Sequence, residues 1–167
     1  SVKTIFANTF KNCWCLTEVN LGNGVETIGK YAFMECGLES VDVSGAALVD
    51  DYAFVSNRLL ESVKLNGEGS DIGEGAFAYC DPLKSVENLN VSENIGDYAF
   101  AYDAITEIDL SGAVNVGINA FMKEEYTEVT VILGEKLVKL GDNPFAMCKI
   151  EPFKTIVKTT VNGHELE

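Results

Sequence analysis

Residues 28–33 read Ile-Gly-Lys-Tyr-Ala-Phe, and the same phrase returns as Ile-Gly-Glu-Gly-Ala-Phe at 72–77 and Ile-Gly-Asp-Tyr-Ala-Phe at 95–100. Looser copies occupy 49–54, 116–121 and 140–145, and the most divergent copy lies at 5–10. The seven copies end at phenylalanines that are 21 to 24 residues apart, at positions 10, 33, 54, 77, 100, 121 and 145. Self-similarity at this period predicts a solenoid, in which each repeat forms one coil.

A second phrase, apolar-x-x-apolar-x-apolar, begins five or six residues after each of the first six phenylalanines. Its last four residues alternate apolar with polar, which is the period of a half-buried β-strand. The copies are Leu16-Val19-Leu21, Leu38-Val41-Val43, Leu60-Val63-Leu65, Leu83-Val86 (then irregular), Ile105-Ile108-Leu110 and Tyr126-Val129-Val131. We therefore expect one strand per coil.

The period separates the repeat architectures. Propeller blades need about 40 residues and tetratricopeptide or ankyrin units about 33, whereas leucine-rich repeats use about 20 to 29. One such coil cannot bury its apolar side chains alone, so it stacks on its neighbours and forms ladders of Phe, Ala and aliphatic residues. The prediction is a leucine-rich-repeat solenoid of about seven coils, with parallel strands on the concave face and short helical or irregular turns on the convex side.

One glycine position recurs inside the first phrase. Either a turn with positive φ or a close approach of two backbones explains a recurrent glycine. Asp50 takes the place in the third coil, and Asp is among the residues that tolerate a left-handed backbone. The glycines are Gly29, Gly73, Gly96, Gly117 and Gly141.

The combined phrase, as in Ile28-Gly-x-x-Ala-Phe33-x-x-Cys36-x-Leu38-x-x-Val41-x-Val43, resembles the BspA-like class of leucine-rich repeats. The resemblance covers residues 2 to 150. It implies a large secreted or surface protein of host-associated bacteria or protists, in a family with members implicated in adhesion to host cells or matrix proteins. It therefore implies an extracellular or cell-surface location, although this fragment has no signal peptide.

The repeat also sets the domain organisation. Residues 1–150 are predicted to form a single solenoid domain, and residues 151–167 a partial further coil or a C-terminal cap. Within that tail, 155–161 is rich in β-branched residues and predicts a strand before the Asn-Gly turn at 162–163. Neither end has an obvious polar cap, so we expect further repeats or domains to flank this piece in its parent protein.

Charge limits the partners. The chain has 12 basic and 26 acidic residues, a formal net charge of −14. Such a field repels nucleic acid and anionic membrane surfaces. No apolar run reaches the roughly 18 residues of a membrane helix, so membrane insertion is not expected. The expected partner is a protein, such as a host matrix or cell-surface protein, or a glycan, and we expect the module to be a monomer.

The five cysteines fit the repeat better than a redox or metal site. Cys13, Cys36, Cys80 and Cys148 each lie three residues after a ladder phenylalanine, where Asn57, Asp103 and Glu124 stand in the other coils. A small polar side chain there satisfies backbone groups of the turn. Cys15 has no counterpart in the repeat and is the best candidate for an accessible thiol.

No constellation of catalytic residues stands out. His164 is the only histidine and lies near the C-terminus, which disfavours Ser-His or Cys-His chemistry and a zinc site. Residues 67–75 partly resemble a calcium-binding nonapeptide, but that motif works in tandem copies and a turn between coils explains the stretch. The sequence predicts a non-enzymatic module with no cofactor and no metal.

Two surfaces are candidates for recognition. The polar positions that flank the middle apolar residue of each strand point away from the core. They form a mainly acidic stripe that either binds a basic partner or merely keeps the sheet soluble. The pairs are Glu18/Asn20, Ser40/Asp42, Ser62/Lys64, Ser85/Glu87, Glu107/Asp109 and Glu128/Thr130.

The second candidate surface is a tyrosine row. Tyr31, Tyr52 and Tyr98 share one repeat position, and Tyr79 and Tyr102 lie two residues after their phenylalanines. Tyrosine rings stack on sugars and grip proteins, or simply cover the edge of a coil. Three hypotheses therefore remain: a protein-binding adhesin segment that uses the acidic stripe, a glycan-binding module that uses the tyrosine row, and a passive spacer.

Overall fold

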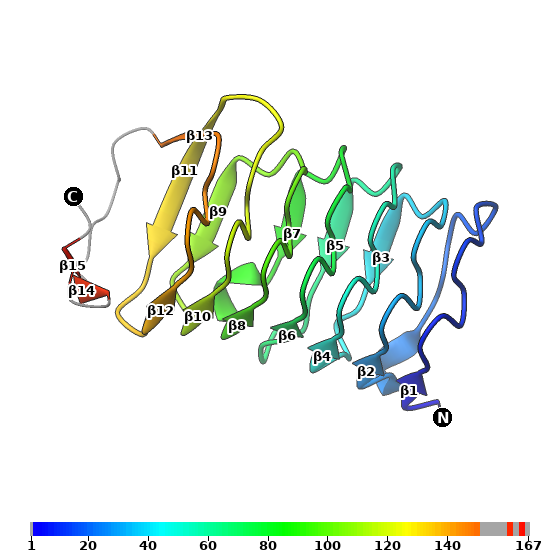
Figure 1. Cartoon of the computed structure of the whole chain (residues 1–167). Helices are drawn as coiled ribbons and strands as arrows, with labels where there is room; N and C mark the ends of the chain where they lie inside the picture. The colour runs from blue at the N-terminus through cyan, green and yellow to red at the C-terminus, as the bar shows by residue number, and fades with distance from the viewer. Residues whose placement is uncertain (1, 151–159, 162–163, 166–167) are drawn as a thin grey trace.

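The computed structural model describes residues 2–150, 160–161 and 164–165, and it contains a row of coils stacked one on another (Figure 1). One parallel sheet runs along the whole row with two-residue strands in the order β1-β2-β4-β6-β8-β10-β12. Each strand belongs to one copy of the first phrase. The strands are β1 (Thr4–Ile5), β2 (Thr27–Ile28), β4 (Leu48–Val49), β6 (Asp71–Ile72), β8 (Asn94–Ile95), β10 (Asn115–Val116) and β12 (Lys139–Leu140).

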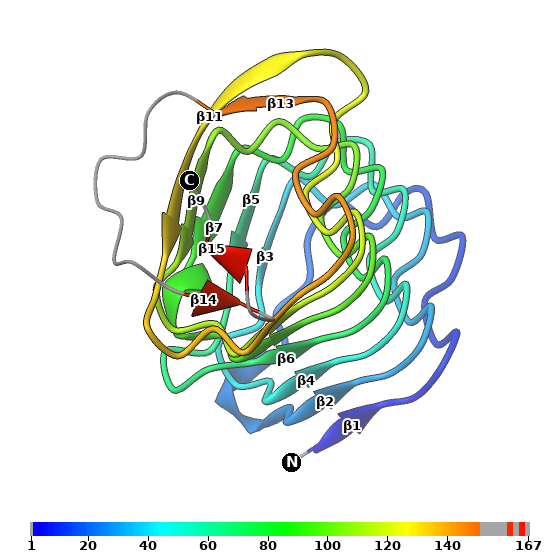
Figure 2. The same cartoon turned by 60° about the vertical axis from the view of Figure 1, so that its left-hand side comes forward.

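The strands predicted for the second phrase form a separate side of the coils from the second coil on (Figure 2). The prediction is wrong for the first coil, where residues 16–21 form no strand. Strands β3 (Ser40–Asp42), β5 (Ser62–Lys64) and β7 (Ser85–Glu87) make one parallel sheet. Strands β9 (Glu107–Leu110), β11 (Thr127–Leu133) and β13 (Cys148–Ile150) make another. The solenoid prediction is confirmed. It did not include the seven-stranded sheet, which occupies part of the perimeter that we expected to contain only turns.

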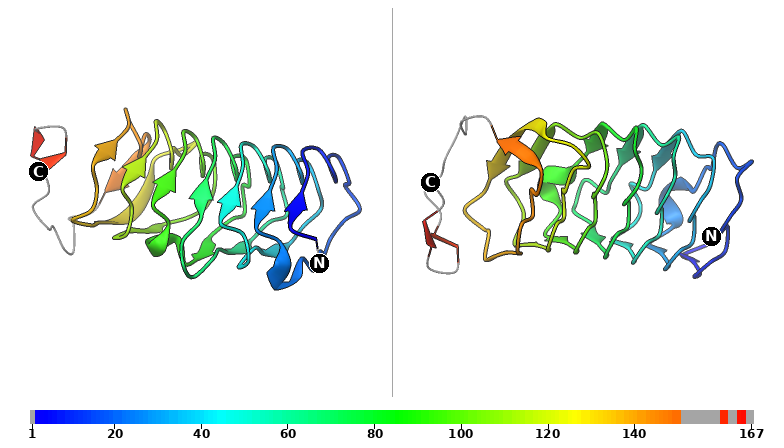
Figure 3. Two further views of the ribbon diagram at one scale, coloured as in Figure 1. Left: turned by 90° about the horizontal axis from the view of Figure 1, so that it is seen from below. Right: turned by 45° about the horizontal axis from the view of Figure 1, so that its top comes forward.

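Helix is almost absent from the described residues. Two 3-10 turns, η1 (Gly22–Gly24) and η2 (Leu89–Val91), are the helical elements there. The remaining side of each coil is a tight turn of the Gly-x-x-Ala-Phe segment, and the coils follow one another in a regular stack (Figure 3). No helix among the described residues is long and apolar enough to cross a membrane.

The core is the predicted phenylalanine column. Consecutive rings from Phe10 to Phe145 stack with centroids 5.0 to 5.9 Å apart and planes within 21° of parallel. The five rings of the middle coils are fully buried, and the ladder alanines beside them are buried as well. Stacked aromatic contacts and the loss of water from each ring together hold neighbouring coils in register.

Close approach of backbones, rather than positive φ, explains the recurrent glycines. A Cβ atom on Gly73 would lie 2.5 Å from the backbone nitrogen of Asp51, and one on Gly96 would lie 2.6 Å from the backbone of Gly73. Neither glycine has a positive φ. The suggestion that Asp50 stands there because Asp tolerates a left-handed backbone is therefore wrong. Its carboxylate instead accepts a hydrogen bond from the Asp51 N–H at 2.8 Å.

The sixth coil departs from the predicted register. Val131 pairs with Ile108, and Leu133 with Leu110, because ten residues rather than eight separate the ladder phenylalanine from the strand centre. The predicted alignment of Glu128 with Glu107 is thus wrong by two residues, and Thr130 takes that place. Tyr126, expected on an apolar ladder, is 79% exposed.

Three of the four repeat cysteines have the predicted structural role. The thiols of Cys36, Cys80 and Cys148 donate to the carbonyl oxygens of Phe10, Phe54 and Phe121, and the Asn57 amide donates equivalently to Phe33. In each case the acceptor lies in a preceding coil. The prediction is wrong for Cys13, which is exposed in the first coil of the structure because no such carbonyl reaches it there.

Thiol reactivity tests this assignment. Burial raises the pKa of the Cys80 thiol, and the pKa of Cys36 is raised by burial as well. We expect an aromatic disulfide reagent to modify the exposed Cys13 and Cys15 on the order of a hundredfold faster than Cys80, which must wait for the coil to open. Mass spectrometry of partially modified protein would locate the labels, and equal rates at Cys80 and Cys15 would contradict the assignment.

The tail is only partly described. Strands β14 (Thr160–Val161) and β15 (His164–Glu165) pair antiparallel, with Val161 opposite His164. The predicted strand at 155–161 thus includes β14, and its residues 155–159 lie outside the described residues. The predicted turn at 162–163 lies outside them too. Whether 151–167 is a further coil or a cap remains a prediction.

Candidate functional site

The strand face consists of the outward side chains of β3, β5, β7 and β9. Register pairing places Ser40 beside Ser62 and Ser62 beside Ser85. The valines between the polar positions point inward, where Val41 and Val63 are buried. Three successive coils therefore present a row of small hydroxyl side chains on the outer side of the sheet.

A row of alternating charge borders the serines. Asp42, Lys64 and Glu87 are neighbours by register, and all three are exposed. The Lys64 ammonium lies 3.8 Å from the Asp42 carboxylate, so one basic residue divides the predicted acidic stripe. Hydrogen bonds from Ser44 hold the pKa of Asp42 below its usual value. A charge-patterned row offers fixed orientation to a partner as well as attraction.

The other predicted acidic residues lie at the two ends of this face. Glu18 lines a small hollow with Asp42 at the beginning of the stack. Glu107 and Glu128 line another shallow hollow near its end, although they are not register partners. A salt bridge of 2.7 Å joins Glu128 to Lys149 and lowers the pKa of that carboxyl. Asp109 is half-buried and accepts a hydrogen bond from the Ser111 N–H.

The turn face is the second candidate surface, formed by residues 30–31, 51–52, 74–75 and 97–98 together with Tyr79 and Tyr102. The rings of Tyr31 and Tyr52 stack at 5.3 Å, and those of Tyr79 and Tyr102 at 4.6 Å. Gly75 interrupts the first row, and the Tyr52 ring leans over it. In each stacked pair, one face of each ring is covered by the other ring. Much of the tyrosine row therefore packs neighbouring coils together.

The row tyrosines have an unusual backbone. Tyr31, Tyr52 and Tyr98 have φ of 56° to 58°, in the left-handed region. The same position is Gly75 in the fourth coil and asparagine in the others, at 8, 119 and 143. Asparagine and glycine adopt this conformation readily, whereas a bulky residue there costs roughly 1–2 kcal/mol. The tyrosines are therefore kept at a position that other residue types would occupy with less strain.

Two lysines, which the repeat pattern does not predict here, complete part of the turn face. The Lys30 ammonium lies 5.5 Å and 5.6 Å from the ring centroids of Tyr31 and Tyr52, and 3.1 Å from Asp51 Oδ2. Lys11 also lies over the Tyr31 ring, 5.2 Å from its centroid. A cation above an aromatic ring is attracted by the negative ring face. The Asp51 hydrogen bond raises the pKa of Lys30.

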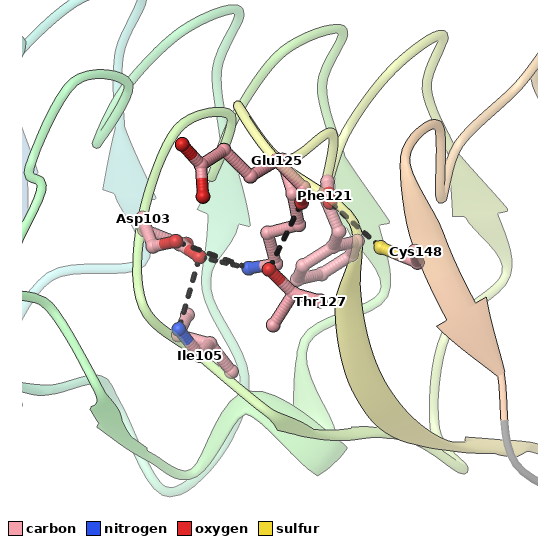
Figure 4. Close-up of polar contacts among 7 residues, drawn as sticks. Asp103, Ile105, Phe121, Glu125, Thr127 and Cys148 are labelled. Atoms are coloured by element: carbon pink, nitrogen blue, oxygen red, sulfur yellow. Dashed lines mark hydrogen bonds and ion pairs between the residues drawn. The ribbon is translucent and has the colours of Figure 1, made fainter.

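A buried ion pair joins the fifth and sixth coils (Figure 4). Asp103 occupies the position of the structural thiols, and the Lys123 ammonium bonds its carboxylate and, at 3.4 Å, its backbone oxygen. Both side chains are at most 2% exposed. Asp103 Oδ1 also accepts from the Ile105 N–H, whereas Oδ2 has no hydrogen-bond partner among the described residues. The sequence shows that an aspartate replaces a thiol at this repeat position, but it does not predict that Lys123 is the partner of Asp103.

This pair gives a testable pH dependence. Burial raises the pKa of Asp103 to about 6, against 3.8 as the reference value, with Lys123 acting in the opposite direction. Because the folded-state pKa is the higher one, the contribution of Asp103 to stability is complete below pH 4 and is lost as the pH rises through 6. We expect wild type to lose up to about 3 kcal/mol between pH 4 and 7 relative to an Asp103→Asn/Lys123→Met variant.

Denaturant unfolding of both proteins at several pH values would measure that difference. The double variant carries all the other acidic residues, so their titration cancels in the comparison. A difference that stays constant from pH 4 to 7 would contradict the raised pKa.

Neither face resembles a catalytic or metal centre. In the described part of the chain, no group of three or more His, Cys, Asp or Glu side chains is arranged to hold a metal ion. The side chain of His164 lies outside the described residues. What the geometry offers is two extended surfaces of repeated side chains.

A parallel solenoid with a period of 21 to 24 residues and aligned hydrophobic ladders defines the leucine-rich-repeat class of proteins. Within that class the chain belongs to the BspA type leucine-rich repeat family, whose model matches six copies over residues 1–102 and 47–163. No curated protein matches it.

A solved structure has the same fold. It is the crystal structure of a leucine-rich repeat protein from Bacteroides ovatus, which is 18% identical and superposes with a TM-score of 0.57. The match covers 88% of this chain and 56% of that protein. The chain thus spans little more than half the length of that neighbour, and the similarity concerns the fold alone.

Proposed function

We propose that this chain is a recognition module of a surface or secreted protein and that it binds a protein partner through the strand face. Leucine-rich repeats of this family form modules for protein interaction in general. Solenoids use their extended faces of aligned side chains for that purpose. The single observation that supports this choice of face is the in-register row of exposed Asp42, Lys64 and Glu87 beside a row of serines.

The partner that fits this face is a protein with a basic patch. The strand face is mostly acidic at its ends, and the whole chain has a formal net charge of −14. Long-range attraction would then steer association and would weaken as salt is added. Host matrix and cell-surface proteins are the candidates, and this proposal includes a non-enzymatic, monomeric module that is flanked by further repeats or domains in its parent protein.

Binding to an array of extracellular-matrix proteins and glycans, at low and at physiological ionic strength, tests this function. We expect salt-sensitive binding to a basic protein. The Asp42→Lys/Glu87→Lys/Asp109→Lys variant should abolish it. A matched Glu26→Lys/Asp71→Lys/Glu93→Lys variant, which changes charge along the seven-stranded sheet, should reduce it far less.

The other outcomes discriminate between the remaining hypotheses. Salt-insensitive binding to glycans alone would favour the tyrosine row as a sugar site. The absence of binding to every protein and glycan would favour a passive spacer. Equal affinity of the strand-face variant and wild type for the bound protein would refute the proposed face.

A further inference from the structure

The turn face contains an internal example of cation binding. The Lys30 ammonium contacts three groups at once: the rings of Tyr31 and Tyr52 and the carboxylate of Asp51. The carboxylate balances the charge of the ammonium group and the ring faces attract it, while the group stays exposed to solvent. The same combination of repeat positions recurs further along the stack.

In the next three coils, carboxylates occupy the repeat position of Lys30. They are Asp51, Glu74 and Asp97, one in each coil. The adjacent phenylalanine rings show that successive coils are 5.0 to 5.3 Å apart, so like charges recur at about that spacing. Lys30 pairs with the first of them. In the described part of the chain, neither Glu74 nor Asp97 forms a salt bridge.

Aromatic rings accompany these carboxylates. Tyr98 is 39% exposed, and no aromatic ring among the described residues stacks on it. Its hydroxyl accepts a hydrogen bond from the Asn119 amide at 3.0 Å. Tyr52 donates its hydroxyl proton to Glu74, so that carboxylate is held at the surface beside a ring. The fourth and fifth coils therefore present two carboxylates and a partly exposed tyrosine ring, without a lysine at the position of Lys30.

We propose that the turn face of the fourth and fifth coils binds a lysine or arginine side chain from a basic segment of a partner protein, between Glu74, Asp97 and the ring of Tyr98. The cation would take the relation to ring and carboxylate that Lys30 has two coils earlier in the stack. A guanidinium suits the site best, because it stacks on the ring and donates to both carboxylates. The strained backbone of Tyr98 is consistent with a ring kept there for contact rather than for turn geometry.

This site is separate from the strand face. Its residues lie in the tight turns, on another side of each coil from β3, β5 and β7 (Figure 2). A partner with two basic segments could engage both faces, but either face can bind without the other. The two proposals therefore need experiments that report on each face independently.

Titration of isotope-labelled protein with the capped peptide acetyl-Arg-Gly-Arg-amide, followed by amide NMR shifts at low salt, provides that resolution. We expect the amides of Glu74, Asp97 and Tyr98 to shift together. The dissociation constant read from them should rise about fivefold in a Glu74→Gln/Asp97→Asn variant, which loses two exposed charge pairings. Gln and Asn keep the acceptors for Tyr52 and for the Ile118 N–H, so the fold is retained.

The matched control is a Glu87→Gln/Asp109→Asn variant, which loses two charges from the strand face. It should leave the constant read at Glu74, Asp97 and Tyr98 within about twofold, because screening weakens charge effects beyond roughly 10 Å. Failure of those amides to shift, or an unchanged constant in the Glu74→Gln/Asp97→Asn variant, overturns the site. Shifts confined to strand-face amides would do the same while supporting the proposed function.

Removal of the internal lysine gives a second, independent test. In Lys30→Met the aliphatic stem remains, but Asp51 and the Tyr52 ring lose their cation, whereas Tyr31 keeps Lys11. We expect the arginine peptide then to shift the amides of residues 51 and 52 as well. Lys84→Met makes the same charge change at a lysine that pairs with Glu61 beside the strand face, and it should not extend the shifts. Equal effects of the two substitutions would show general electrostatics and refute the site.

Discussion

Replacement of Phe77 by alanine is expected to lower the free energy of unfolding by about 3–5 kcal/mol. The ring is fully buried and stacks on Phe54 at 5.2 Å and on Phe100 at 5.3 Å. Its removal leaves a cavity between two coils. The chain cannot easily close that cavity, because the Phe77 N–H donates to the Ala99 carbonyl of the next coil and the adjacent Ala76 carbonyl accepts from the Phe54 N–H of the preceding coil. Urea unfolding measured by circular dichroism gives the change.

Phe10→Ala is the matched control for this prediction. Among the described residues the Phe10 ring stacks on one neighbour only, Phe33 at 5.0 Å, and it is half-buried. The same truncation should therefore cost clearly less than at Phe77. Similar losses at the two positions would mean that the rings do not act as members of one column.

Lys123→Met is expected to lower the free energy of unfolding by roughly 3–5 kcal/mol at pH 7, the cost of a buried charge without its partner. Methionine matches the length of the lysine stem, so the loss reports on the charge rather than on volume. Asp103 would remain in a buried position, with Oδ2 already without a partner among the described residues. Thermal and urea unfolding of the single variant measure the effect.

The Asp103→Asn/Lys123→Met double variant should recover most of that loss. The third coil shows why, since Asn57 occupies the same repeat position and donates its amide to the carbonyl oxygens of Phe33 and Phe54. Replacing a buried ion pair by neutral, well-bonded groups is often neutral or stabilising. If the double variant were as unstable as Lys123→Met alone, the pair would not be the source of the effect.

The period of the repeat explains how much of the fold was predictable. Stacked coils repeat each environment, so the sequence shows the Phe, Ala and thiol ladders as recurring letters at a fixed spacing. The strands of the second phrase followed from alternation alone. The seven-stranded sheet was missed because its strands are two residues long, too short for any period to be read.

Other features depended on information that a repeat pattern does not hold. Two extra residues before β11 moved Glu128 out of the predicted row, and only the pairing of β11 with β9 shows where the register resumes. The contact of Lys123 with Asp103 joins two different repeat positions, so no ladder predicts it. Lys30 likewise departs from the residue types of its row, and its contact with two rings depends on side-chain directions.

The candidate faces were predictable to a similar extent. The strand face was identified from the alternation of apolar and polar residues, but the division of its acidic stripe by the Asp42–Lys64 contact was visible only in space. The sequence shows that the tyrosines of the row share a repeat position. It does not show their left-handed backbone or the stacking of their rings in pairs. Binding by either face remains a proposal.

Nuclear Overhauser contacts between phenylalanine rings, in protein whose rings alone are protonated, measure the stacking most directly. We predict contacts from Phe33 to Phe54, from Phe54 to Phe77 and from Phe77 to Phe100, where centroids are 5.0 to 5.3 Å apart. Rings two coils apart, such as Phe33 and Phe77, should show none. Missing contacts between neighbours in the series, or contacts that skip a coil, would contradict the continuous column on which both recognition faces depend.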